Sequence, residues 1–268
     1  MPAPASREPI SVLTDWWMAM GVSVDEALVG ALMEAAPAPA EAEASAAPAL
    51  GQDAPPVRRR SGRGVEDWVS EARKLAEACA DMDALAAAIR DFQGSPLKAA
   101  CEKTVVYDGV AGASLMVIGE GPGAEEDRQG KPFVGRAGQL LDKMLAAIGR
   151  SRADNALISN VNYWRPPGNR NPEAEELAVC RPFVDRMIEI NRPKLIVAAG
   201  GVPAVSLLQS RDGIMKLRGN EYRYTTPGGF SAPLIPMLHP AYLLRRPQDK
   251  SRAWRDLLLI EQRLGELE

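Results

Sequence analysis

The sequence predicts an α/β fold, in which a mostly parallel β-sheet carries helices on both faces. Four short apolar runs predict buried strands, and they lie at residues 115–118, 156–159, 194–199 and 233–238. Stretches with helical periodicity separate the first three runs, at residues 137–149 and 173–190, and a helix near 202–209 follows the third. This alternation of strands and helices is typical of a parallel sheet covered by helices.

The chain before the first strand predicts three parts. Residues 1–34 are interpreted as a short helical extension, since a capping box lies ahead of an apolar patch. Residues 35–64, rich in Ala and Pro, predict a disordered linker. The basic run that ends the linker, Arg58–Arg63, is either solvated or in contact with nucleic-acid phosphates. Two helices are expected over 65–91, and the main domain is placed at residues 65–268.

The composition limits the compartment and the chemistry. The chain has 268 residues, of which 46% are apolar, enough for one core. It contains no run of 18 apolar residues and no basic-then-apolar signal at its N-terminus, so we expect a cytoplasmic protein without a membrane span. Three widely spaced cysteines and a single histidine, His239, argue against a disulfide framework or a zinc site.

The formal net charge of −3 hides an asymmetry between the two parts of the chain. Residues 1–109 carry 10 basic and 17 acidic side chains, whereas residues 110–268 carry 22 basic and 18 acidic ones. The main domain is therefore mildly basic, which permits contact with nucleic acid without requiring it.

Residues 114–138 form the stretch around which the fold is predicted to be organised. After the first strand comes a tight turn of small or φ-restricted residues, Gly119, Gly121, Pro122 and Gly123. Three acids follow at 125–127, in an expected ordered loop that also holds Phe133, and a helix is expected to begin near Ala137. The glycines formally fit a dinucleotide fingerprint, but a pyrophosphate there would face the three acids. A purely structural turn would leave Phe133 unexplained.

Polar side chains follow three of the predicted strands at their carboxyl ends. Glu120, Asn160 and His239 all occupy this position, and binding sites of parallel sheets lie at that edge. With Phe133 as a stacking surface, these groups suit a flat, polar ring. Asn160 can read an amide edge, and His239 can stabilise a developing negative charge. Taken singly, Asn160 could instead cap a strand, and His239 could be a loop histidine with its hydrogen bonds satisfied.

Two further segments have the character of a nucleic-acid contact. The loop from Arg165 to Arg170 is rigid and basic, and Leu243 and Leu244 precede Arg245 and Arg246. Apolar wedges beside basic residues are typical of proteins that unstack bases. The alternative is a helix start that buries both leucines.

These motifs together resemble the family 4 uracil-DNA glycosylases. The resemblance spans about residues 92–260 and is carried by 119–123 with Glu126-Asp127, by 130–138, by Asn160 with 165–170, and by 239–245. It implies a three-layer α/β/α fold with a four-stranded, mostly parallel sheet. It also implies hydrolysis of the bond between uracil and deoxyribose in single- or double-stranded DNA, by a monomer that acts on the nucleoid in the cytoplasm.

The resemblance implies a role for each site residue in a base-flipping mechanism. Leu243 or Leu244 fills the gap in the stack, Phe133 stacks on uracil, Asn160 pairs with N3–H and O4, and His239 stabilises charge on O2. Gly119, Gly121 and Gly123 let the backbone approach the base and sugar. Glu120 positions the water, with Glu126 as the competing candidate. The remaining DNA contacts fall at Arg165, Asn169, Arg170, Arg245 and Arg246.

The chain departs from this family at the positions that bind its four-iron, four-sulfur cluster. The four ligand cysteines align with Phe92, Ser95, Trp164 and Cys180, so that only Cys180 is a cysteine. Aromatic rings cannot bind iron, and a serine replaces a thiolate poorly. We therefore expect no cofactor and no metal, with Phe92 and Trp164 filling the volume of the cluster.

Two further functions stay open from the sequence. One is a uracil- or abasic-DNA-binding protein with weak or no glycosylase activity. A scaffold of this kind that traps a covalent abasic adduct carries a histidine in its basic insertion, whereas 165–170 has none. The other is a DNA scaffold that lost its activity together with the cluster.

Overall fold

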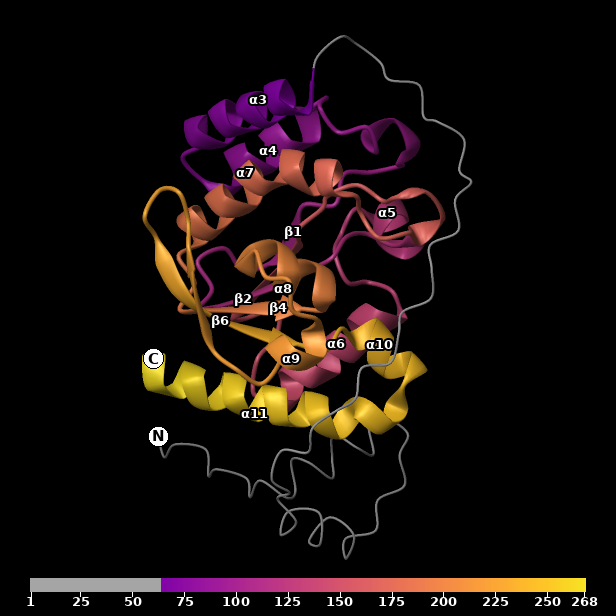
Figure 1. The fold of residues 1–268 in the computed structure, drawn as a ribbon. Helices are drawn as coiled ribbons and strands as arrows, with labels where there is room; N and C mark the ends of the chain where they lie inside the picture. The colour runs from indigo at the N-terminus through magenta and orange to yellow at the C-terminus, as the bar shows by residue number, and fades with distance from the viewer. Residues whose placement is uncertain (1–63) are drawn as a thin grey trace, which may run out of the picture. The chain divides into compact units, whose positions relative to one another are not determined.

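A computed structural model describes residues 64–268 of the chain (Figure 1). The helical extension predicted over residues 1–34 and the linker predicted over 35–64 lie outside the described residues, apart from Gly64. Residues 65–268 fold as one unit. No helix among the described residues is long and apolar enough to cross a membrane.

The predicted α/β class is confirmed, and four parallel strands form the centre of the sheet. They are β2 (Leu115–Gly119), β3 (Ala156–Asn160), β4 (Leu195–Ala199) and β6 (Ser231–Met237). β2, β3 and β4 are buried along their whole length, which explains their continuous apolar runs. In the register Gly119 lies opposite Asn160, and Ala199 opposite Met237. The residues that follow these strands therefore share one edge of the sheet.

Among residues 64–268 the sheet has six strands, so the expected count of four was wrong. The strand order is β1-β3-β2-β4-β6-β5. β1 (Tyr107–Gly109) and β5 (Tyr222–Thr225) are short edge strands that pair antiparallel with β3 and β6. All of β1 is only half-buried, and β5 alternates between buried and exposed residues, so neither carries the apolar run that marks the central strands.

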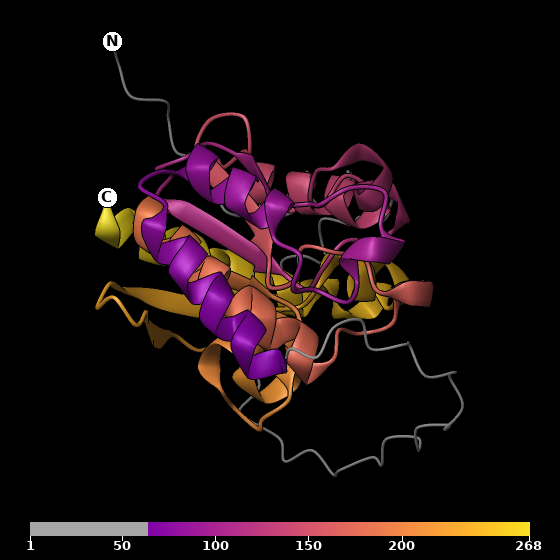
Figure 2. The same ribbon diagram turned by 90° about the horizontal axis from the view of Figure 1, so that it is seen from above.

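Helices cover both faces of the sheet (Figure 1). One face carries α3 (Val65–Ala78), α4 (Met82–Asp91), α7 (Ala174–Asn191) and α8 (Gly201–Leu208). Figure 2 shows α3 and α4 outermost on this side. The other face carries α6 (Arg136–Ala147), α10 (Pro240–Arg245) and α11 (Lys250–Leu267), whereas α9 (Ile214–Leu217) contacts α8 and packs into the same core as α8. The helices expected near 65–91, 137–149, 173–190 and 202–209 correspond to α3 with α4, α6, α7 and α8.

The segment after the glycine turn is helical, not the ordered loop that the sequence suggested. α5 spans Ala124–Gln129, and Gly123 is its N-cap. Its first turn holds the three acids, which is where carboxylates are favoured by the helix dipole. The loop that carries Phe133 is therefore short, and it joins α5 directly to α6.

Candidate active site

The glycine at the end of β2 allows three groups of the predicted site to meet. A Cβ atom on residue 119 would lie 2.5 Å from the Phe133 ring and 2.6 Å from Oδ1 of Asn160. No side chain fits in that space, so glycine is required here for close approach rather than for its backbone angles. Asn160 ends the neighbouring strand β3, directly opposite Gly119.

His239 joins this group from the end of β6. Its imidazole stacks on the Phe133 ring, with 5.5 Å between centroids and 27° between planes. Phe133 is 6% exposed, although it lies in a loop. The structure thus brings Phe133 together with Asn160 and His239, the latter two placed at this edge of the sheet by their positions after predicted strands.

The carboxamide of Asn160 is buried and unpaired. The residue is 2% exposed, and neither Oδ1 nor Nδ2 has a hydrogen-bond partner among residues 64–268. A strand-end cap would use one of these atoms on the backbone, so that interpretation does not hold. A buried amide without partners costs free energy, because its hydration is lost without replacement. A carboxamide in this state can bind a ligand that offers one donor and one acceptor.

The environment of His239 fixes its protonation. The Nδ1 atom accepts a hydrogen bond from the backbone N–H of Ala241, at 3.1 Å, and so caps α10. Burial, together with the charge of Arg245, lowers the pKa of His239 to about 4. The ring is therefore neutral at physiological pH, and its proton is on Nε2, where it can be donated to an acceptor.

We expect NMR titration of the untagged protein to give a pKa near 4 for His239. The signal is unambiguous because the chain has a single histidine. Since the unfolded ring takes up its proton near pH 6.5, its burial removes stability as the pH falls from about 6.5 towards 4. Arg245→Gln should raise the pKa of His239, since it removes a repelling charge. A pKa of about 6.5 in the folded protein would contradict this environment.

The two carboxylates considered for the water have different surroundings. Glu126 accepts hydrogen bonds at both oxygens: Oε2 from the N–H of Gly123 at 3.2 Å, and Oε1 from those of Val134 and Gly135 at 3.0 and 2.9 Å. These bonds hold the glycine turn and the Phe133 loop and occupy both oxygens of the carboxylate. The assignment of Glu126 as a candidate to position the water is therefore corrected. Glu120 is half-buried, and burial raises the pKa of its carboxyl.

The same contacts decide against a nucleotide at the glycine turn. The N–H of Gly123, which a pyrophosphate would use, is already bound to the Glu126 carboxylate. A phosphate there would meet a negative charge instead of bare amides.

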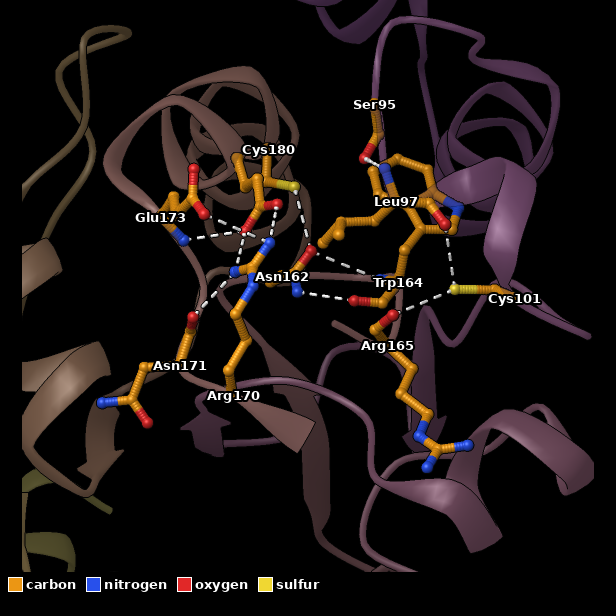
Figure 3. A network of polar contacts seen from close by, with 11 residues as sticks. Ser95, Leu97, Cys101, Asn162, Trp164, Arg165, Arg170, Asn171, Glu173 and Cys180 are labelled. Carbon is orange, nitrogen blue, oxygen red and sulfur yellow. Dashed lines mark hydrogen bonds and ion pairs between the residues drawn. The ribbon is translucent and has the colours of Figure 1, made fainter. Parts of the chain in front are cut away.

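The 165–170 loop is held by its own side chains. Arg165 donates from Nε to Oδ1 of Asn169 at 2.7 Å. Arg170 donates from two nitrogens to Glu176, at 2.9 and 2.6 Å, and Glu176 is buried at the start of α7 (Figure 3). Arg170 thus ties the loop to α7; its side chain is still 38% exposed, so its contact with DNA phosphates stays a prediction. The side chain of Arg165 is 32% exposed and can still reach solvent.

The two leucines that were expected to form a wedge lie on different sides of α10. Leu243 is fully buried, whereas Leu244 is 39% exposed. The assignment of Leu243 as an intercalating residue is therefore wrong, because it packs into the core on the inner face of α10. Leu244, Arg245 and Arg246 remain together on the exposed side.

The positions that align with the cluster ligands are filled by a packed core. Phe92, Ser95, Trp164 and Cys180 are all at most 5% exposed. The Phe92 ring lies 6.2 Å from Trp164 and 5.2 Å from Phe183 between centroids. The thiol of Cys180 contacts Oδ1 of Asn162 at 3.7 Å (Figure 3). These residues do not fit a four-iron, four-sulfur cluster, because rings occupy its volume and one thiol remains.

The nearest other cysteine does not replace a ligand. Cys101 directs its thiol to the carbonyls of Leu97 and Arg165, at 3.2 and 3.4 Å. Burial raises its pKa to about 11, so it stays protonated. Within residues 64–268 no three His, Cys, Asp or Glu side chains are arranged to hold a metal ion.

A residue that the sequence analysis did not identify also reaches the site. Arg152 lies in the turn before β3, and its guanidinium donates to the carbonyls of Pro132 and Phe133, at 3.0 and 2.8 Å. No motif surrounds it in the sequence, so only the tertiary structure identifies it.

Comparison with known proteins agrees with this geometry. The family model of the uracil DNA glycosylase superfamily matches residues 107–258. The chain belongs to this superfamily. It is 38% identical over 172 residues to the type-4 uracil-DNA glycosylase of Thermotoga maritima, a match that covers 64% of this chain and 87% of the relative. It is 34% identical to those of Pyrobaculum aerophilum, over 67% of this chain and 93% of the relative, and of Saccharolobus solfataricus, over 69% and 87%.

Proposed function

We infer that this protein is a uracil-DNA glycosylase, which hydrolyses the N-glycosidic bond of a flipped-out deoxyuridine and leaves an abasic site. The observation that carries this function is the unpaired carboxamide of Asn160, buried beside the stacked rings of Phe133 and His239. Uracil presents N3–H and O4 side by side, so one carboxamide can accept from the first and donate to the second. Cytosine has the reverse pattern and would leave a buried mismatch.

We propose that His239 stabilises the departing base as a neutral donor. As the glycosidic bond breaks, negative charge develops on uracil, and an Nε2–H aimed at O2 lowers the energy of that state. The ring acts as a neutral donor from Nε2–H, since its pKa of about 4 leaves Nδ1 without a proton at physiological pH. Phe133 stacks on the base and excludes water from it.

We propose that Glu120 holds the attacking water. The hydroxyl adds to C1′ of the deoxyribose, the bond from C1′ to N1 breaks, and N1 takes the bonding electrons. The raised pKa of the half-buried Glu120 suits a group that takes up the water's proton.

Leu244 is proposed to fill the gap left in the stack, because it is the exposed leucine of α10. One chain supplies every group, so we expect a monomer to be active on chromosomal DNA in the cytoplasm.

We also propose that the enzyme works without an iron–sulfur cluster. This rests on the aromatic core at the ligand positions. The purified protein should be colourless, without absorbance typical of such clusters and without stoichiometric iron. A brown protein with about four irons per chain, the content of the cluster itself, would refute the proposal.

The deciding experiment measures abasic-site formation on single- and double-stranded oligonucleotides that contain one uracil. We expect product from uracil and none from cytosine at the same position, with no added metal. Circular dichroism confirms that the protein tested is folded. If uracil-containing DNA is bound but no abasic product forms, the protein is a uracil-DNA-binding protein instead.

Salt should weaken DNA binding through the two exposed arginines at the end of α10, Arg245 and Arg246. Replacing Arg245 and Arg246 together with Gln should reduce the slope of log K against log salt by about 1 to 2, since each phosphate contact contributes about 0.9 on duplex DNA. Arg263→Gln is the control, because Arg263 pairs with Glu221 and lies near the C-terminal end of α11. An unchanged slope in the double variant would place the DNA track elsewhere.

A further inference from the structure

The Phe133 loop adopts a backbone that it does not favour by itself. Phe133 has φ of 53°, in the left-handed region that residues with a Cβ atom avoid. The first turn of α6 lies so close that a Cβ atom at Gly138 would collide with the Phe133 carbonyl. The ring reaches its position over Gly119 only if other groups hold this conformation.

Two oppositely charged side chains hold this loop from two sides. Glu126 accepts from the N–H groups of Val134 and Gly135. Arg152 donates from Nη1 to the carbonyl of Pro132 and from Nη2 to that of Phe133. Every one of these hydrogen bonds has a charged partner, which makes it stronger than a neutral one. The three peptide groups that join Pro132 to Gly135 are thus fixed in succession.

Arg152 is itself held in place by carboxylates. It pairs with Asp108 at 3.1 Å and with Asp142 at 2.8 Å, and its side chain is 18% exposed. Asp108 belongs to the edge strand β1, and Asp142 to α6. The arginine therefore connects the sheet and α6 to the loop, so its position does not depend on the loop alone.

We propose that Arg152 is a positioning residue for base recognition: it holds the Phe133 backbone so that the phenyl ring stays beside His239 and over Gly119. It does not touch the base. The proposal rests on the proposed function, because Phe133 is the surface on which uracil stacks. A ring displaced by about 1 Å can reduce a rate about a hundredfold, so a backbone support affects catalysis through position alone.

Arg150 offers a matched control two residues away. Its side chain is 15% exposed and binds both carboxylate oxygens of Glu268, at 2.7 and 2.8 Å. Arg150→Met therefore removes a similarly buried guanidinium whose two hydrogen bonds go to Glu268 and not to the Phe133 loop.

The first arm of the test uses the single histidine as an NMR probe and needs no activity. The ring current of Phe133 shifts the ring-proton signals of His239, because the two rings stack. Arg152→Met should move these signals towards their positions in Phe133→Ala, and Arg150→Met should leave them unchanged. If Arg152→Met leaves them unchanged as well, the proposal is overturned, whether or not the protein is a glycosylase.

The second arm is a double-mutant cycle on uracil excision. Arg152→Met should lower kcat/KM about 10- to 100-fold in the intact protein, but less than about threefold in Phe133→Ala, since the ring to be positioned is then absent. Arg152→Lys should be intermediate, and it replaces the Met variant if the latter does not fold. An equal loss in both backgrounds would refute positioning through Phe133. No product from the wild-type protein would instead refute the proposed function.

Discussion

Replacing Asn160 with Ala should lower kcat/KM for uracil excision at least about a hundredfold, the loss expected when one transition-state hydrogen-bond donor is removed. Asn160→Asp should fail similarly, because a carboxylate accepts from N3–H but cannot donate to O4. Single-turnover formation of abasic product measures the effect on the chemical step. Near-normal rates in either variant would contradict the role of Asn160 in reading the base.

The same change should leave the stability of the fold intact. The side chain of Asn160 makes no hydrogen bond among residues 64–268, so Asn160→Ala removes a buried polar group and leaves no partner unsatisfied. Asn191 is the matched control: it is 3% exposed, accepts from the Gly112 N–H at 2.7 Å and donates to the Ala113 carbonyl at 3.2 Å. Asn191→Ala should cost about 1 to 3 kcal/mol of unfolding free energy and keep its activity. The two asparagines thus separate function from stability.

The sequence predicted the centre of the fold because the central strands are buried throughout. Each such strand is a short apolar run, and the polar residue after it marks the edge where a site can form. That logic located Asn160 and His239 from their places in the chain. It also failed in a specific way: β1 and β5 have no apolar run, since edge strands are half-buried.

The sequence-based predictions that failed at the site concern which groups a side chain contacts in the folded protein. Glu126 was considered for the water because it is an acid near the turn, yet it binds three backbone N–H groups. Leu243 and Leu244 are equivalent in the sequence, and only the orientation of α10 buries the first. Arg152 lies 19 residues beyond Phe133, so no local motif relates the two. Long-range contacts of this kind have no periodicity to detect.

The aromatic core at the cluster positions leads to the second large prediction, which concerns stability. Trp164→Ala should lower the free energy of unfolding by about 3 to 5 kcal/mol, as expected when a buried aromatic side chain is truncated and leaves a cavity. Trp164 is fully buried, packs against Phe92 and Tyr163, and donates from Nε1 to Oγ1 of Thr104 at 3.0 Å. Urea denaturation measures the loss.

A control is needed because any buried tryptophan stabilises its fold. Trp254 in α11 is 5% exposed and lies outside this core, so Trp254→Ala should show a comparable loss of stability. The difference should appear at the 165–170 loop. Asn162 donates to the Trp164 carbonyl at 2.6 Å and accepts from its N–H at 3.3 Å, and the buried Trp164 ring anchors this same backbone where the loop begins (Figure 3).

We therefore expect Trp164→Ala, and not Trp254→Ala, to increase proteolysis within residues 165–170 and to weaken DNA binding under conditions where both variants are folded. Trp164→Phe should keep most of the stability, since most of the ring volume is retained and only the hydrogen bond to Thr104 is lost. A loss below about 1 kcal/mol for Trp164→Ala would mean that the core tolerates the void, against the usual cost of a cavity. In that case the side chains at 92 and 164 would not substitute structurally for a cluster.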